Sequence, residues 1–364
     1  MRFSKLSAAA FCSLVFFFCS LSTHAQQMGW EKVASAASVA RQRGDLVEAE
    51  TLYKQSLALQ QKTMGPNRWE VAITLNNLAV FYQDEYRYAE AESLYKQSLA
   101  IWEKVPGREV QAASSMNNFA ALYHEEGKDV EGASLYNRAL GIWKKINRTD
   151  SPEALVSLCG LAEIYSAQTR FDDAEPLYKQ ALSIWGKNGQ MQSPDAQNAL
   201  THLANIYYSR GSYSEAEPLY AKALVIENRI VSTETPETIT SLNNLAQIYR
   251  SQSRYSEAEP LLARVLEIRE KRLGPDHIDV AASVSNLALL YNCEGKYAQA
   301  EPLYKKAVEI REKILGPQHP DVAQSLQMYA ALLRQEGKIA EAQKLETQAE
   351  RIQINATQKM GSGS

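Results

Sequence analysis

Imidazole, thiol and carboxylate groups are the side chains of this chain that could support acid–base catalysis, nucleophilic attack or metal binding. After residue 25 the histidines are His124, His202, His277 and His319, and the last two recur in one loop sequence, Gly-Pro-Asp-His and Gly-Pro-Gln-His. Glutamates recur as Glu-Ala-Glu segments at expected helix starts, where acidic side chains favour the helix dipole. Because His277, His319 and these glutamates repeat with the segments around them, we interpret them as structural.

The sequence motifs of the common catalytic classes are missing. There is no His-Glu-x-x-His, no phosphate-binding glycine loop, no Gly-x-Ser-x-Gly elbow and no paired-cysteine metal motif. We therefore expect no catalytic residue, no metal site and no cofactor, and we interpret the chain as a protein without enzymatic activity.

A tyrosine that returns at a fixed interval is the strongest pattern in the sequence. The spacings are 41, 42, 42, 42 and 42 residues, between Tyr82, Tyr123, Tyr165, Tyr207, Tyr249 and Tyr291. A period of this size indicates a stacked repeat array. Such an array presents a long surface of equivalent positions, which usually binds other chains.

Each repeat predicts two helices joined by a tight corner. Leu242, Leu245, Ala246 and Tyr249 follow one another at i, i+3, i+4 and i+7, which places them on one stripe of a first helix. The second helix contains Ser-x-x-Glu segments such as the one ending at Glu217, whose spacing predicts a capping box.

Glycine stands at five of the eight corners between the two helices. Gly127, Gly211 and Gly295, with Gly44 and Gly337 in the end units, suit the left-handed conformation that ends many helices. In three other repeats the same position holds a residue that adopts this conformation at a cost, so those corners could be built differently. These residues are Tyr86, Thr169 and Ser253.

Counting repeats gives eight helix pairs and an all-α fold. They are predicted to start near Trp30, Val71, Ala112, Ala154, Ala196, Thr238, Asp279 and Asp321. We interpret the last pair as a cap, because its second helix, Ala340 to about Ile352, is rich in Glu, Gln and Lys. We divide the chain into a leader at 1–25, a repeat domain at 26–352 and a flexible tail at 353–364.

Residues 29–352 resemble tetratricopeptide repeats of the kinesin light chain type. The resemblance rests on the 42-residue period and on Leu-Asn-Asn-Leu-Ala, Glu-Ala-Glu-Pro-Leu-Tyr and Leu-Gly-Pro segments. It implies a right-handed superhelical solenoid of antiparallel helix pairs whose first helices line a concave groove. It also implies a protein or peptide partner, without naming it.

Two rows of residues beside the packing stripe are candidate binding positions. Five residues before each tyrosine position the row contains Asn77, Asn118, Gly160, His202, Asn244, Asn286 and Met328. The resemblance implies that its asparagines hold a peptide backbone, and the alternative is that they brace neighbouring helices. One residue after the tyrosine position, Arg250 and Arg334 could pair with ligand carboxylates or remain solvated.

Three tryptophans share one position of the second helix: Trp102, Trp143 and Trp185. Later repeats hold Glu227, Arg269 and Arg311 there, which suggests that the position reaches solvent. We therefore predict a partly exposed aromatic contact ridge; the alternative is that the tryptophans pack between adjacent pairs.

The first 25 residues predict a secretory signal peptide. Arg2 and Lys5 precede an apolar run of 14 residues, Ala8–Leu21, and Ala25 offers a cleavage site. The alternative is an uncleaved anchor, but the run is shorter than the ~20 residues of a spanning helix. Cleavage would lower the formal charge from −3 to −5 by removing those two cations. This charge gives no case for a nucleic-acid partner or, after cleavage, for membrane binding.

The remaining cysteines, Cys159 and Cys293, lie three repeats apart, so we expect free thiols.

The sequence as a whole predicts an exported, secreted or periplasmic scaffold that binds a peptide or protein segment in its groove. The alternative is an assembly component that oligomerises through its end faces or an aromatic ridge; the oligomeric state is left open.

Overall fold

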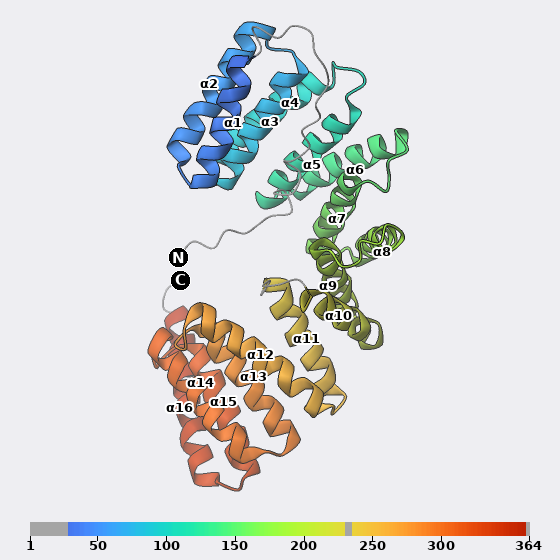
Figure 1. The fold of residues 1–364 in the computed structure, drawn as a ribbon. Coiled ribbons are helices and arrows are strands. Elements are labelled where there is room, and N and C mark those ends of the chain that lie inside the picture. The colour runs from blue at the N-terminus through green and yellow to red at the C-terminus, as the bar shows by residue number, and fades with distance from the viewer. Residues whose placement is uncertain (1–27, 230–234, 362–364) are drawn as a thin grey trace. The chain divides into compact units, whose positions relative to one another are not determined.

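The computed structural model describes residues 28–229 and 235–361, whose regular structure is helical throughout (Figure 1). The leader expected at residues 1–25 lies outside the described residues. The chain divides into two compact units, Met1–Met191 and Gln192–Ser364. Among the described helices, none has both the length and the apolar character needed to cross a bilayer.

The first unit contains four helix pairs, with bounds α1 Met28–Arg43, α2 Leu46–Met64, α3 Trp69–Asp84, α4 Tyr88–Trp102, α5 Glu109–Glu125, α6 Asp129–Lys145, α7 Pro152–Ala167 and α8 Phe171–Lys187. The second unit contains four more, with bounds α9 Pro194–Ser209, α10 Tyr213–Glu227, α11 Pro236–Ser251, α12 Tyr255–Leu273, α13 Ile278–Glu294, α14 Tyr297–Leu315, α15 Pro320–Gln335 and α16 Ile339–Gly361. Each pair begins within three residues of its predicted position, which confirms the all-helical array of consecutive pairs.

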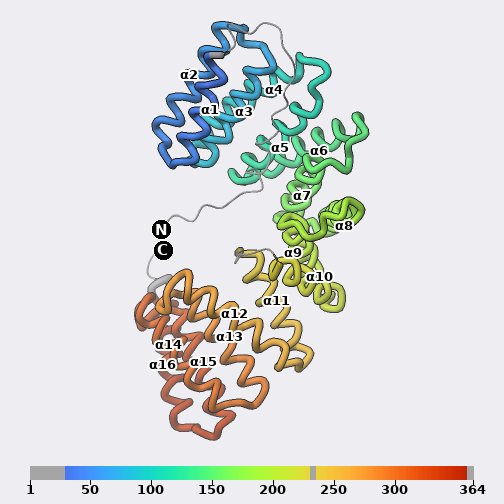
Figure 2. The backbone as a smooth tube through the Cα atoms, viewed as in Figure 1, coloured from blue at the N-terminus to red at the C-terminus, as the bar shows by residue number. Residues whose placement is uncertain are grey.

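The predicted stripe is the surface through which the helices pack. Leu242, Leu245 and Ala246 of α11 are each at most 2% exposed, and alanines equivalent to Ala246 are buried in the other pairs. A small residue at this position lets the second helix of the pair come close. Figure 2 shows the backbone of the helices as a tube along the chain. Burying each leucine stabilises the stack by roughly 1.5–3 kcal/mol.

Serine, threonine and proline start several of the first helices. The hydroxyls of Ser151, Ser193 and Thr235 accept hydrogen bonds from the amide three residues on, and proline follows each of them at the first helical position. Proline loses nothing there, because that amide would have no partner inside the helix. These caps fix where α7, α9 and α11 begin.

At every corner between paired helices, the residue in the same position adopts the left-handed conformation, whether it is glycine or not. Gly127 has φ 74°, and Tyr86, Thr169 and Ser253 have φ of 59°, 58° and 59°. The idea that these three corners differ in construction is therefore wrong. Each non-glycine residue adopts the left-handed conformation at a cost of roughly 1–2 kcal/mol, which the packing of the helices on either side outweighs.

Two other local predictions are also corrected. The capping box is not formed, because α10 begins at Tyr213 and no side chain caps it, while Glu217 binds Arg254 of the next pair instead. The tail expected from residue 353 is helical as far as Gly361, since no helix-breaking residue interrupts α16 before that glycine.

Candidate functional site

A contact between side chains, which we call the clasp, recurs between consecutive helix pairs and joins one pair to the next. Its members are the last glutamate of a Glu-Ala-Glu segment, or of Gln-Ala-Glu at Glu301, and, from the following pair, a tyrosine and a basic residue just after the corner. The tyrosine stands five residues before the basic residue, except that Tyr329 stands nine before Lys338.

In the first clasp Tyr82 Oη donates to Glu50 at 2.9 Å and Arg87 donates to the same carboxylate at 2.8 Å. The Arg87 guanidinium also lies 4.2 Å from the centre of the Tyr82 ring. One carboxylate therefore ties together two consecutive pairs.

The clasp recurs in both units. The tyrosine and the basic residue both donate to Glu92 (Tyr123 at 3.2 Å, Lys128 at 2.9 Å) and to Glu301 (Tyr329 at 3.0 Å, Lys338 at 2.6 Å). Glu259 accepts from Tyr291 at 2.8 Å with Lys296 at 3.9 Å, and Glu217 accepts from Arg254 at 2.6 Å. Sequence reasoning assigned these glutamates to the helix dipole and missed the contact. The signal was a basic residue 36 or 37 positions after the glutamate in each case.

Two members of the clasps have shifted pKa values. The pKa of Glu50 is lowered to about 2, chiefly by the hydrogen bond from Lys54 one helical turn away, with Tyr82 and Arg87 adding to the effect. The pKa of Tyr291 rises to about 12, mainly because burial disfavours the phenolate and also because its hydroxyl donates to Glu259. Glu50 therefore stays ionised and Tyr291 stays protonated over a wider pH range than is usual for their residue types.

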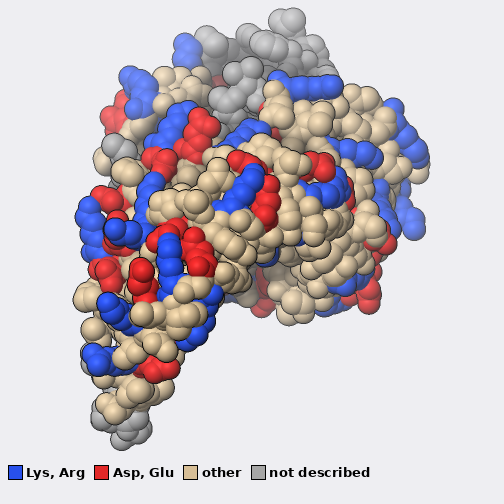
Figure 3. Space-filling model, turned by 90° about the horizontal axis from the view of Figure 1, so that it is seen from below, with Lys and Arg blue, Asp and Glu red and all other residues tan. Residues whose placement is uncertain are grey.

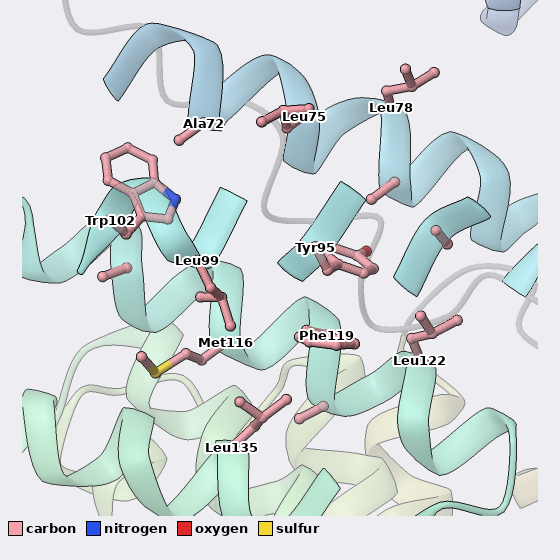
Figure 4. Packing of buried hydrophobic residues seen from close by; sticks show 14 of the residues in the cluster. Ala72, Leu75, Leu78, Tyr95, Leu99, Trp102, Met116, Phe119, Leu122 and Leu135 are labelled. Atoms are coloured by element: carbon pink, nitrogen blue, oxygen red, sulfur yellow. The ribbon is translucent and has the colours of Figure 1, made fainter. Parts of the chain in front are cut away.

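The tryptophan row is core, so the prediction of an exposed ridge is wrong. Trp102, Trp143 and Trp185 are 4%, 0% and 5% exposed. The Trp143 Nε1 donates to Ser157 Oγ at 3.1 Å, and Trp102 belongs to the same apolar cluster as Ala72, Leu99 and Met116 (Figure 4). The alternative of packing between adjacent pairs holds.

The charged residues in the equivalent position of later pairs explain the error. Arg269 donates to Ser283 Oγ at 2.8 Å and to the Asp279 carbonyl at 3.0 Å, and Arg311 reaches the serines of α13 and α15. Glu227 is 3% exposed and pairs with Arg264 at 3.0 Å. A charge in this position therefore marks a polar contact with the next pair, in which Glu227 is buried and the two arginines are half-buried.

The asparagine row divides into free and bonded members. Asn77 is exposed and Asn286 is half-buried, and neither has a side-chain partner among the described residues. Asn118 Nδ2 approaches Asn76 Oδ1 only at 3.5 Å, and His202 is half-buried.

Asn244 behaves as the bracing alternative predicts. Its Nδ2 donates to Asn205 Oδ1 at 3.2 Å and to Tyr220 Oη at 2.9 Å, so both of its donors are used inside the fold. The residue equivalent to Tyr220 one repeat later is Leu262, which has no hydroxyl. The counterpart of Asn205 also differs, since it is Gln247, whose side chain accepts from Tyr208. Neither partner of Asn244 is therefore repeated around Asn286.

Glycine interrupts the row in the first unit. A Cβ added at Gly160 would lie 2.3 Å from Cζ of Tyr136, so the tyrosine ring of α6 occupies the space of the missing side chain.

The two arginines of the second candidate row differ in their partners. Arg334 donates twice to Glu346, at 2.6 Å each, whereas Arg250 has no carboxylate partner in the described chain and lies 3.9 Å from Cys293 Sγ.

Charges of both signs are mixed over the surface. On the face seen in Figure 3, lysine and arginine side chains alternate with aspartate and glutamate. Within residues 28–229 and 235–361, no three or more His, Cys, Asp or Glu side chains gather as they would around a metal ion. Neither Cys159 nor Cys293 forms a disulfide there.

Comparison with known protein families assigns this architecture. The tetratricopeptide repeat family matches residues 33–104, 70–131, 111–187, 195–271 and 279–355. The chain belongs to the tetratricopeptide repeat family. Folds of this family typically act as scaffolds for contacts between proteins. No curated protein sequence matches the chain.

Solved structures of other repeat proteins are similar to it. A STAND-type signal transduction ATPase with a tetratricopeptide repeat sensor, from Pyrococcus horikoshii, is 15% identical over 92% of this chain and 49% of its own, with a TM-score of 0.62. The apo form of RapI is 15% identical over 79% of this chain and 99% of its own, with a TM-score of 0.55. The kinesin light chain-like repeats of Podosopora anserina are 28% identical over 55% of this chain and 94% of their own, with a TM-score of 0.47.

Proposed function

We propose that this tetratricopeptide repeat protein is an exported, non-enzymatic scaffold that holds an extended peptide or protein segment along the first helices of its pairs. The observation that carries the proposal is the amide of Asn286, which is half-buried at a repeated position of α13 and has no side-chain partner among the described residues. A primary amide both donates and accepts, so it can bond the C=O and N–H of a peptide whatever the peptide's side chains are.

Arg250 adds a charge preference in the second unit. Arg250 belongs to α11, the first helix of the pair that precedes α13. Its guanidinium has no carboxylate partner among the described residues. A cation in that state gains more from a ligand carboxylate than Arg334 does, since Arg334 would first have to leave Glu346. We therefore assign the ligand-carboxylate role to Arg250 and not to Arg334.

The test is capture by the immobilised mature chain from the exported fraction, with identification of the bound segment and titration of a synthetic peptide copy. Asn286→Ala should weaken binding by roughly tenfold, because each lost bond to a desolvated peptide group costs about 1–3 kcal/mol. Leu262→Tyr should weaken it similarly from a distance, by offering the amide of Asn286 a hydroxyl as Tyr220 does for Asn244.

Arg334→Ala is the matched control and should leave affinity unchanged, since its charge is already neutralised. Equal affinity of the wild type, Asn286→Ala and Leu262→Tyr would contradict a role of this row in binding. The export part is tested separately by sequencing the mature N-terminus. It should begin at Gln26, and a native protein that retains Met1 in the membrane would refute cleavage.

Assembly through an aromatic ridge loses its support, because the three tryptophans are buried. The molecular mass of the protein in solution distinguishes the two remaining alternatives, because assembly through the end faces gives oligomers and the scaffold proposal does not require them. We expect a monomer, because the last helix, α16, presents Gln343, Lys344, Thr347 and Gln348 as exposed side chains.

A further inference from the structure

Three large apolar side chains stand out in water at the corners of the first unit. Val47, Tyr86 and Val130 are 79%, 75% and 77% exposed, more than any other large apolar side chain in the described ranges. Val47 and Val130 are the second residues of α2 and α6, and Tyr86 is the left-handed corner residue before α4. The three therefore belong to consecutive pairs, at the side where the second helices begin.

The clasps align these three residues, which we call the apolar edge. Arg87, next to Tyr86, donates to Glu50, which stands nearly one helical turn after Val47, at 2.8 Å. Lys128, two residues before Val130, donates in the same way to Glu92 of α4 at 2.9 Å. Each corner is therefore held against the beginning of the preceding second helix, so the exposed side chains follow one another along a single edge.

Tyr86 has a backbone conformation that the fold itself does not require of a tyrosine. Its φ is 59°, which is costly for a bulky residue, and glycine stands at the equivalent corners on either side, Gly44 and Gly127. The side chain gains little burial in return, since it meets the Tyr88 ring edge-on with 6.2 Å between the centres and is otherwise largely exposed. Strain without a benefit inside the fold points to a contact outside it.

A hollow opens beside Val130, between α4 and α6. Its volume is about 540 Å³. Its floor is apolar and consists of side chains that Figure 4 shows close together, Leu99, Phe119 and Leu135. The two cations on its walls, Lys96 and Arg138, each pair with a glutamate, at 2.6 and 2.9 Å. A groove of this kind between two helices accepts the apolar face of a third.

The corners that carry the apolar edge are strongly acidic; they comprise residues 42–48, 84–90 and 125–131. They contain nine acidic and three basic side chains, which gives a formal charge of −6. The equivalent segments of the second unit contain five acidic and four basic side chains, a charge of −1; they are residues 209–215, 251–257, 293–299 and 335–341. Three acidic residues of the edge have no basic partner among the described residues: Asp45, Glu85 and Glu131. A cationic partner is therefore favoured here and not at the corners of the second unit.

We propose that the apolar edge and the hollow beside it form a docking surface for a basic amphipathic helix of another protein. The apolar face of that helix covers Tyr86 and Val130 and enters the hollow, while its lysines or arginines meet Glu85 and Glu131. Both the exposed apolar side chains and the uncompensated charge are then satisfied by one partner. The surface uses corners and second helices of the first unit, so it is a different site from the one proposed around Asn286.

The probe is a fluorescent amphipathic helix of Leu and Lys, about 18 residues long, titrated against the full chain by fluorescence anisotropy. Tyr86→Gly should weaken its binding roughly tenfold and raise the melting temperature, because glycine adopts this φ without cost. The matched control is Ser253→Gly, which relieves the same conformation in the second unit. It should also raise the melting temperature but leave the affinity unchanged. A loss of affinity in a variant of higher stability cannot be caused by unfolding.

Glu131→Lys and Glu215→Lys make the same charge change at equivalent positions of the two units. Glu131→Lys should weaken binding roughly tenfold at low salt, whereas Glu215→Lys should stay within about twofold of the wild type. A peptide with Ser in place of Leu should bind much more weakly, because it has no apolar face for the edge. Asn286→Ala should bind the probe as the wild type does, which separates this surface from the proposed peptide site.

Equal affinities of the wild type, Tyr86→Gly and Glu131→Lys would overturn the proposal. Equal losses in Glu131→Lys and Glu215→Lys would also overturn it, because the probe would then respond to the total charge and not to the edge. A wild-type dimer that Tyr86→Gly converts to a monomer would show that a second copy of the chain covers the edge, and would rule out the basic helix as its occupant.

Discussion

Trp143→Ala tests most directly whether the tryptophan row is core. The side chain is 0% exposed, and truncating a buried large aromatic residue costs about 3–5 kcal/mol. Loss of the hydrogen bond from its Nε1 to Ser157 Oγ at 3.1 Å adds about 1 kcal/mol. We therefore expect the free energy of unfolding to fall by about 4–6 kcal/mol. In a stacked array this loss should appear first in the helices that touch it, α5 to α7.

The assay is urea denaturation followed by far-ultraviolet circular dichroism, because the substitution itself removes a fluorophore. Val130→Ala, in the same helix but 77% exposed, is the control and should change the free energy of unfolding by less than about 0.5 kcal/mol. Trp143→Phe keeps most of the buried ring and should lose about 1–2 kcal/mol. A loss within about 1 kcal/mol for Trp143→Ala would refute the burial argument.

Three further outcomes are expected. Asn244→Ala should lower the free energy of unfolding by about 1–2 kcal/mol, and Asn286→Ala by less than about 0.5 kcal/mol; reversed values in denaturant titrations would contradict the bonding pattern of the row. The folded pKa of Glu50, about 2, is below its ordinary 4.5, so its contribution to stability is complete above pH 4.5 and is lost as the pH falls toward 2; denaturation midpoints that are equal at pH 6 and pH 2.5 would refute this. Gly160→Ala should destabilise by roughly 1–3 kcal/mol because its Cβ meets a tyrosine ring, while Gly141→Ala, in open space on α6, should be neutral or stabilising; matching melting temperatures would argue against that contact.

The positions of the helices could be predicted from sequence because their signals are local. The i, i+3, i+4, i+7 stripe at Leu242 and Leu245 depends only on the helical period, and both residues are buried as expected. The 42-residue period then fixed where each pair starts. Burial of the stripe, pairing of the helices and succession of the pairs all follow from these two periods.

The environment of side chains between pairs could not be predicted in the same way. Arg269 occupies the position of Trp143, and taken alone it indicates a solvent-exposed position. Its guanidinium is instead satisfied by Ser283 and a backbone carbonyl 10 residues on, in the next pair. Glu217 has capping-box spacing within its own helix, yet a cation 37 residues later binds it. In both cases the deciding partner lies one repeat away.

The asparagine row shows the same dependence at the proposed binding positions. Its members occupy one site of the repeat, but the residue 24 positions before Asn244 is Tyr220, whose hydroxyl accepts from the amide, and the residue 24 positions before Asn286 is Leu262. A hydroxyl at this position does not by itself commit the amide, because Tyr53 stands 24 positions before Asn77 and lies near Ser38 instead, at 3.4 Å between the two hydroxyl oxygens. The bonding of an inner asparagine therefore depends on the contacts that the preceding pair actually makes, and not on the residue type at one position. For that reason the repeat pattern predicts where candidate binding residues stand but not which of their amides the fold already uses.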